Sequence, residues 1–173
     1  MGNVETQRQG YVGGAGTKPF NGAPYEGLQS LDLDGYPNAG GISQTILTTP
    51  GALYSLSFAY ANNPYRIGPA LATVYVQNFS SNADLITPFP IAHGTATASD
   101  YDWTLSPTLY FFAQESSTNL RFVSNDVAFT DAGIFLDAIS VVAVPEPASF
   151  ILAGLGLMGV LGARRRHDGL SSC

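Results

Sequence analysis

The chain has 173 residues and a formal net charge of −6, and only 12% of its residues are charged. The residues after Pro147 hold three arginines and one aspartate, so residues 1–147 carry four basic and twelve acidic side chains. Because phosphate binding needs lysine and arginine, this balance excludes non-specific nucleic-acid binding. The single cysteine, Cys173, excludes a disulfide within the chain and a zinc site made from cysteines.

Glycine (19 residues), proline (11) and aromatic residues (12%) are plentiful, which is typical of short strands joined by turns. Residues 1–29 show no clear period, and their glycines indicate an irregular segment. Beyond it, alternating or β-branched stretches predict strands at 30–34, 41–47, 53–60, 71–79, 89–92, 103–113, 120–124 and 134–144.

Two pairs of these strands are expected to form hairpins. Thr49-Pro50-Gly51 reads as a tight turn between 41–47 and 53–60, and residues 115–119 read as the loop before 120–124. The last strand, 134–144, is almost continuously apolar and is expected to be well buried. The predicted core consists of Leu56, Phe58, Val74, Val76, Leu109, Phe111, Leu120, Phe122, Ile139 and Val141.

No segment before the tail has a helical period. Strands at this spacing predict an all-β, antiparallel β-sandwich over residues 30–143.

The tail, residues 144–166, has three parts in strict order. Pro145, Glu146 and Pro147 come first and predict an extended, accessible hinge, because each proline fixes φ and removes a donor. An uncharged apolar run follows at 148–163, and then Arg164, Arg165 and Arg166, which favour the cytoplasmic side.

The apolar run predicts a single short transmembrane helix. Its sixteen residues reach roughly 24 Å, against a hydrocarbon core of about 30 Å. The alternative, a buried core helix, calls for a polar face, which this run lacks.

These three parts resemble a PEP-CTERM sorting signal over residues 144–166. The resemblance implies export, transient insertion of 148–163 into the inner membrane of a Gram-negative bacterium, and processing near Pro145–Pro147 by an exosortase. The protein would then reach the cell surface or the exopolysaccharide matrix. The chain departs from the pattern in its seven further residues, 167–173.

A second resemblance covers residues 30–142, through SLDLDG, GISQT, Pro50-Gly51, Trp103-Thr104 and Leu136-Asp137. These pieces resemble the choice-of-anchor C domain, which is similar to galactose-binding-like jelly rolls and sandwich carbohydrate-binding modules. Such domains open with a strand reading roughly Asn-Gly-Ser-Phe-Glu, and nothing here matches it. An exported chain also needs a basic and then an apolar start. We therefore expect the true start to be missing and one sheet to lack an edge strand.

No catalytic set can be assembled from the sequence, and we predict that the protein is not an enzyme. His93 reads as a solvated loop histidine, and Asp100 and Asp102 as a solvated loop end. No nucleophile-elbow motif is present.

Three residues are candidates for binding. Tyr101 and Trp103 lie near loops, where aromatic rings either stack on sugars or close the core. Asp137 lies in an apolar strand; it either accepts backbone N–H groups at the sheet edge or, as the sandwich modules imply, helps to hold a structural calcium.

The sequence therefore predicts an exported surface or matrix protein that binds extracellular polysaccharide. The alternatives are a structural or adhesive matrix protein without a small ligand and, ranked last, a glycan-active enzyme.

Overall fold

The computed structural model describes residues 3–8, 11–12, 19–35, 38–126 and 132–145. The chain divides into two compact units, Met1–Ala143 and Val144–Cys173. Only Val144 and Pro145 of the second unit are described, so the expected helix at 148–163 and the residues at 167–173 lie outside the described part. Within the described part, no helix is long and apolar enough to cross a membrane.

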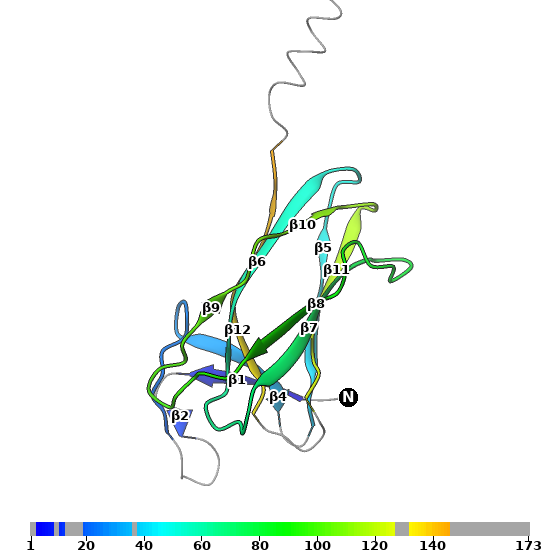
Figure 1. Ribbon diagram of the computed structural model, residues 1–173. Helices are drawn as coiled ribbons and strands as arrows, with labels where there is room; N and C mark the ends of the chain where they lie inside the picture. Colours follow the sequence, from blue (N-terminus) through cyan, green and yellow to red (C-terminus); the bar gives the residue numbers. More distant parts are fainter. Residues whose placement is uncertain (1–2, 9–10, 13–18, 36–37, 127–131, 146–173) are drawn as a thin grey trace, which may run out of the picture. The chain divides into compact units, whose positions relative to one another are not determined.

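The first unit is a sandwich of two antiparallel sheets (Figure 1), which confirms the predicted fold class. The larger sheet has the order β1–β4–β12–β6–β10, and β9 also pairs with β6. Its strands are β1 (Asn3–Arg8), β4 (Gln29–Gly35), β6 (Leu53–Asn62), β9 (Thr104–Leu105), β10 (Leu109–Phe112) and β12 (Ile134–Ala143).

The smaller sheet has the order β5–β11–β7–β8. Its strands are β5 (Gly41–Leu47), β7 (Ala70–Asn78), β8 (Phe89–His93) and β11 (Ser117–Ser124). A separate short pair joins β2 (Tyr11–Val12) to β3 (Pro19–Phe20).

The core lies between the two sheets because one face of each strand is apolar. Phe58 of β6 meets Phe122 of β11 edge to face, with ring centroids 5.1 Å apart, so this pair connects the layers. All ten predicted core residues belong to this cluster. Leu109, Ile139 and Val141 are partly buried in it, and the remaining seven are buried.

Neither predicted hairpin forms. β5 pairs with β11, whereas β6 pairs with β12, β10 and β9, so the turn after β5 crosses from one sheet to the other. Gly51 takes a positive φ of 82° there, and its N–H donates to the carbonyl of Ala113 over 2.7 Å. Likewise, β10 and β11 belong to different sheets. In both cases the apolar faces of the two strands meet across the core, which requires opposite layers.

The predicted strand at 103–113 is split into β9 and β10. Pro107 follows Ser106 between them and has no N–H to give to a ladder. Ser106 keeps the segment attached to β6, since its Oγ accepts from the Phe58 N–H at 3.0 Å and its N–H donates to the Phe58 carbonyl at 2.9 Å.

Two further expectations are corrected at the ends of the chain. Asn3–Arg8 is not irregular: it forms β1, which pairs with β4 and supplies the edge strand that we expected to be missing. β12 is fully buried only over its first three residues, and Val142 is exposed. The strand is mostly apolar, but several residues of its second half, Val142 among them, are open to solvent.

Candidate functional site

The sorting motif begins directly after the last strand. Pro145 is exposed and lies two residues beyond β12. Glu146 and Pro147, together with Arg164, Arg165 and Arg166, lie outside the described residues. Their predicted roles therefore rest on the sequence.

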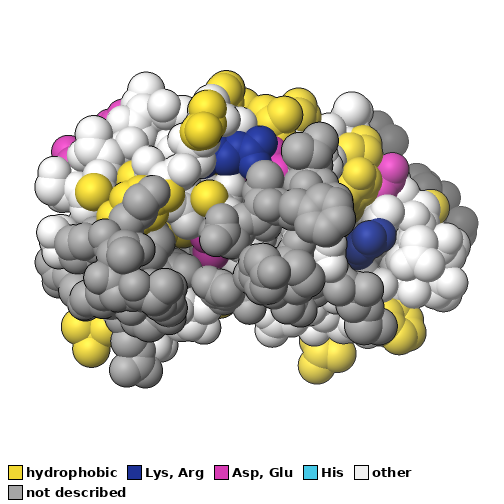
Figure 2. Space-filling view, turned by 90° about the horizontal axis from the view of Figure 1, so that it is seen from below, with side chains coloured by type: hydrophobic (Ala, Val, Ile, Leu, Met, Phe, Trp, Pro, Cys, Tyr) yellow, Lys and Arg dark blue, Asp and Glu magenta, His cyan; other side chains and the backbone are white. Residues whose placement is uncertain are grey.

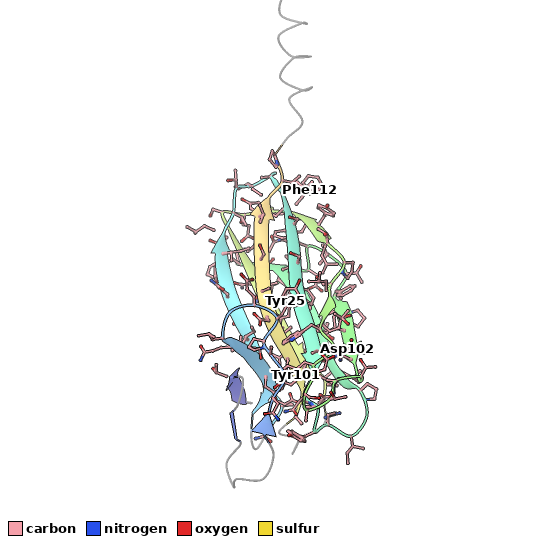
Figure 3. All side chains as sticks on the ribbon, turned by 90° about the vertical axis from the view of Figure 1, so that its left-hand side faces the viewer. Tyr25, Tyr101, Asp102 and Phe112 are labelled. Atoms are coloured by element: carbon pink, nitrogen blue, oxygen red, sulfur yellow. The ribbon has the colours of Figure 1, made fainter. Side chains whose placement is uncertain are left out.

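An aromatic cluster covers the outer face of β12 near its start. Tyr101, which is labelled in Figure 3, is only 2% exposed. It packs edge to face on Phe135, with ring centroids 5.1 Å apart. Gly22 lies against the same ring, where an added Cβ would come within 2.4 Å of it. This burial argues against the predicted sugar-stacking role of Tyr101, because the ring is closed off from solvent.

Trp103 closes the same cluster from the outside. Its Nε1–H donates to the carbonyl of Ala23 at 2.9 Å, and its ring lies 6.2 Å from that of Tyr25. The indole is partly buried, and it packs on Phe135 at 6.5 Å. These contacts match the core-closing alternative for Trp103.

His93 is not a solvated loop histidine, as the sequence had indicated. It is the last residue of β8 and is buried. Its Nε2 donates to the carbonyl of Asp102 at 2.8 Å, and its Nδ1 accepts from the Asn62 N–H at 3.1 Å. The ring therefore joins β6, β8 and the 95–103 loop, and both of its nitrogens contact groups within the fold.

Asp137 lies on the wall of a cavity of about 370 Å³ at the edge of the larger sheet. Its carboxylate accepts from the N–H of Ala138 at 2.7 Å and from that of Glu26 at 3.2 Å. Ala138 has a left-handed φ of 48°, at the point where a bulge shifts the pairing of β12 with β6. The predicted backbone-accepting role of Asp137 is therefore present.

The cavity also offers oxygen atoms from other residues. The buried hydroxyl of Ser30 has no hydrogen-bond partner among the described residues, and Thr6 and Gln29 line the same cavity. Calcium prefers oxygen ligands and needs six to eight of them, and this lining supplies one carboxylate together with hydroxyl and amide oxygens. Among the described residues, no group of three His, Cys, Asp or Glu side chains is placed to hold a metal ion. The charge at this cavity thus comes from one described carboxylate.

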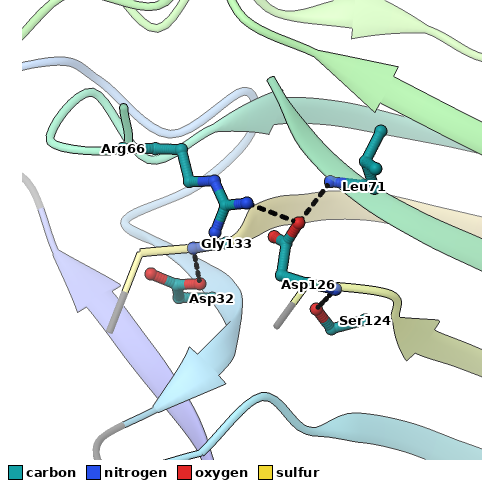
Figure 4. Close-up of polar contacts among 6 residues, drawn as sticks. All are labelled: Asp32, Arg66, Leu71, Ser124, Asp126 and Gly133. Carbon is teal, nitrogen blue, oxygen red and sulfur yellow. Dashed lines mark hydrogen bonds and ion pairs between the residues drawn. The ribbon is translucent and has the colours of Figure 1, made fainter. Parts of the chain in front are cut away.

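Asp32 has a pKa that is shifted further from its ordinary value than that of Asp126 or Glu115. Its Oδ1 accepts from the N–H groups of Asp34 (3.0 Å) and Gly133 (3.2 Å), and its Oδ2 accepts from Nδ2 of Asn63 (2.9 Å). Burial raises the pKa of Asp32 to about 8, although these three donors pull it down. The contact with Gly133 is drawn in Figure 4.

Asp126 and Arg66 form an ion pair at the same end of the sandwich (Figure 4). Their Oδ1 and Nη2 atoms are 2.9 Å apart, and Oδ1 also accepts from the N–H of Leu71 at 3.2 Å. Burial raises the pKa of Asp126 to about 6, against the lowering effect of the Arg66 guanidinium. The pair fixes the loop before β7 to the residues after β11.

The outer face of the smaller sheet carries a set of polar side chains that the sequence did not single out. Cross-strand pairing aligns them in two rows of three, which we call the polar grid: Ser43, Arg121 and Tyr75 in one row, and Thr45, Asn119 and Gln77 in the other. The grid measures roughly 7 by 10 Å, from the rise along a strand and the spacing between strands.

The members of the polar grid hold one another in place. The Arg121 guanidinium carbon lies 5.4 Å from the centre of the Tyr75 ring, and Nη1 donates to Oε1 of Gln77 at 3.3 Å. Thr45 donates to Oδ1 of Asn119 at 2.7 Å. Charged side chains are sparse elsewhere too: the view from below shows a few dark blue and magenta groups, and one dark blue group lies beside a magenta one (Figure 2). The grid is thus a pre-ordered set of planar donors and acceptors.

Comparison with known proteins finds the sorting motif in the sequence and a related fold among solved structures. Residues 143–166 match the family model described as the PEP-CTERM protein-sorting motif. No curated protein matches the chain.

Among solved structures, the chain is similar to a family 35 carbohydrate-binding module from Clostridium thermocellum. The identity is 13% and the TM-score 0.50, over 82% of this chain and 92% of that one. It is also similar to the CBM22-1 xylan-binding domain of Paenibacillus barcinonensis Xyn10C, with 16% identity and a TM-score of 0.49 over 85% of each chain. At such identity the first likeness shows the fold, a sandwich of the carbohydrate-binding-module type.

We expect Asp32 to make the protein less stable as the pH rises. The folded state keeps the Asp32 proton up to a pH of about 8, whereas the unfolded state releases it near its ordinary pKa of 3.8. The contribution of Asp32 is therefore complete below pH 3.8 and is lost as the pH rises to about 8. An Asp32→Asn variant cannot titrate, so its free energy of unfolding should fall less over this range.

The measurement is urea unfolding at mildly acidic and mildly alkaline pH. Asp100→Asn, a change at an exposed loop aspartate, should keep the wild-type dependence. An Asp32→Asn protein whose stability falls as steeply as that of the wild type contradicts the assignment.

Proposed function

We propose that the protein is exported, is sorted through its C-terminal signal and binds polysaccharide at the cell surface or in the extracellular matrix. The observation that carries the proposal is the match of residues 143–166 to the sorting motif. A sorting motif of this kind supports export toward the cell surface through the membrane. We also propose that an exosortase processes the tail, that residues 148–163 insert transiently into the membrane, and that the host is a Gram-negative bacterium.

The order of the tail explains how sorting would work. The sandwich ends with β12 at Ala143, and Pro145 follows exposed, so a membrane enzyme could reach the Pro145–Pro147 segment without opening the sheet. The apolar run would hold this segment at the membrane, and the arginines would keep the far end on the cytoplasmic side.

The polar grid is our proposed polysaccharide site. Sugar hydroxyls need donors and acceptors in fixed positions. Arg121 and Asn119 supply both on one face, while the buried Gln77 holds Arg121 through its Oε1 and Asp84 through its Nε2. Fixing these side chains in advance reduces the entropy lost on binding. The excess of acidic residues in the first 147 residues favours a neutral glycan over an acidic one. For the alternative, a structural matrix protein, the described residues offer no comparable supporting feature. That the protein is not an enzyme stays a prediction.

We also propose that Asp137 holds a structural calcium together with the hydroxyls of Ser30 and Thr6. The ion would neutralise the carboxylate and tie β1, β4 and β12 together at the edge of the larger sheet.

The sorting proposal predicts that motif variants are retained. In an exosortase-bearing host, the wild type should lose its tail and leave the inner membrane, whereas Glu146→Ala with Pro147→Ala should stay full-length there. Mass spectrometry of membrane and external fractions measures both. Glu26→Ala, an exposed glutamate outside the motif, is the matched control and should be processed normally. Equal masses and locations for the wild type and the motif variant contradict the proposal.

The polysaccharide proposal predicts that Arg121→Ala weakens binding to a neutral exopolysaccharide by about 10- to 100-fold. This range follows from the 1.5–3 kcal/mol of a hydrogen bond to a charged group. Affinity electrophoresis measures it, with Ser140→Ala on the opposite sheet as a control that should bind normally. If the wild type is not retarded by any neutral or acidic polysaccharide, or if Arg121→Ala is retarded equally, the polar grid is not the site.

The calcium proposal predicts that Ca²⁺ raises the melting temperature of the wild type and that EDTA reverses the rise. Binding to the folded state alone stabilises it by mass action. Asp137→Asn should lose the effect, and Asp84→Asn, at an exposed aspartate elsewhere, should keep it. Mg²⁺ should act more weakly, since it demands a smaller octahedral site. Identical melting curves of the wild type in Ca²⁺ and EDTA speak against the ion.

A further inference from the structure

One end of the sandwich is unusually apolar. Of the ten large hydrophobic side chains that are exposed among the described residues, five lie at this end, and each is 53–88% exposed. We call these five the apolar end patch: Leu47, Phe79, Tyr110, Phe112 and Val142. Single exposed hydrophobic residues are normal, but a group of them marks an interaction surface.

Strand pairing places the five residues at the same end of the sandwich, two on the smaller sheet and three on the larger. Leu47 pairs with Ser117, and Asn78, next to Phe79, pairs with Thr118, so both lie beside the start of β11. Tyr110 and Val142 are both opposite Ser55, and Phe112 is opposite Leu53. Figure 3 shows Phe112 at this upper end and Tyr101 toward the other.

Hydrogen bonds join the two sheets at this end. The Gly51 N–H donates to Ala113 at 2.7 Å, and the Thr48 N–H donates to Ser116 at 3.0 Å. The patch therefore spans both layers on a rigid support.

Charge is almost absent here. Loops 48–52, 79–83 and 113–116 contain one charged residue, Glu115, whose carboxylate accepts from the N–H and the hydroxyl of Ser80. No lysine or arginine occurs in these loops. A partner for this surface must therefore be recognised through apolar contact and not through charge.

The proposed insertion of the tail would place a bilayer near this end of the sandwich. Val142 belongs to the patch, and the apolar run begins at residue 148, only six residues later. Six residues span at most roughly 20 Å even when fully extended. When the run is inserted, the membrane surface must lie within that reach of the patch, and a tether this short gives a high effective concentration.

We propose that the apolar end patch contacts the headgroup region of the membrane into which the tail inserts. Tyrosine favours this interface because one end of its ring is apolar and the other is wet, and phenylalanine and leucine bury their apolar side chains at the same depth. The contact would hold the Pro145–Pro147 segment close to the bilayer surface, within reach of a membrane enzyme. The inference rests on the proposed insertion of the tail.

The test uses the full chain in a Cys173→Ser background, with an environment-sensitive fluorophore on Ser81→Cys. This position lies in the 79–83 loop and leaves all five patch residues intact. The matched control carries the label on Ile67→Cys, in the loop at the opposite ends of β6 and β7. The proteins are added to phosphatidylethanolamine–phosphatidylglycerol vesicles that carry nitroxide headgroup lipids.

Flotation of the vesicles reports insertion of the tail, so it tests the proposed function separately. In the floated fraction, we expect the label at residue 81 to shift to the blue and lose most of its emission to the nitroxide, while the label at residue 67 stays unquenched. Leu47→Ser with Phe112→Ser should restore emission at residue 81 with unchanged flotation and circular dichroism. Added salt should not weaken the quenching, because apolar contact is not screened and salt screens only the repulsion between the acidic domain and phosphatidylglycerol.

Several results would overturn the inference. If the chain floats but the residue-81 label stays unquenched, the patch does not contact lipid. Quenching that needs exosortase in the vesicles assigns the patch to the enzyme, and quenching that grows with protein density assigns it to a second copy. A chain that fails to float overturns the insertion on which the inference depends.

Discussion

The buried carboxylate of Asp32 joins three neighbouring strands of the larger sheet. It accepts from the backbone of β4 itself, from Gly133 just before β12, and from Asn63 just after β6. Each of these donors is buried, and a buried donor without a partner costs about 1–3 kcal/mol. The position of the central strand therefore depends on one side chain.

The packing around this carboxylate leaves little freedom of sequence. An added Cβ at Gly133 would come within 2.5 Å of Cγ of Asp34, so only glycine fits between the two aspartates and β12. The Asp-Leu-Asp-Gly stretch of β4 places Leu33 in the core and the two aspartates on the other side of the strand. Alternation alone explains where these side chains point, but not why acids are buried there. The donors come from β6 and β12, which lie far away in sequence.

This difference between local and non-local information runs through the whole fold. The strands β5, β6, β7 and β8 could be predicted closely because a period of two is a local property of each segment. Their partners could not, since the turn at Pro50-Gly51 looks the same whether it joins neighbours in one sheet or crosses between layers. β1 was missed because NVETQR is polar and sits at an edge, where one face needs no apolar side chains.

The candidate sites also differ in whether neighbouring or distant residues in the sequence form them. The sorting motif is linear, so its proline, apolar and arginine parts could be read directly from the sequence. The polar grid draws two residues from each of three strands, and nothing near Arg121 in the sequence indicates that Tyr75 and Ser43 lie beside it. For Tyr101, the sequence left sugar stacking and core closing open for a related reason: its cover comes from Gly22 and Phe135, which are distant in the chain.

The order of the elements also explains how one chain could carry a temporary membrane segment and a lasting fold. Every strand of the described part ends by Ala143, before the motif begins, so cleavage near Pro145 removes no strand and no core residue. The removed part carries three of the seven basic residues of the chain. What remains is strongly acidic, and such a surface discourages self-association and binding to anionic matrix components. In the proposed processed form, this acidic charge would therefore favour partners that are recognised by hydrogen bonds and apolar contact.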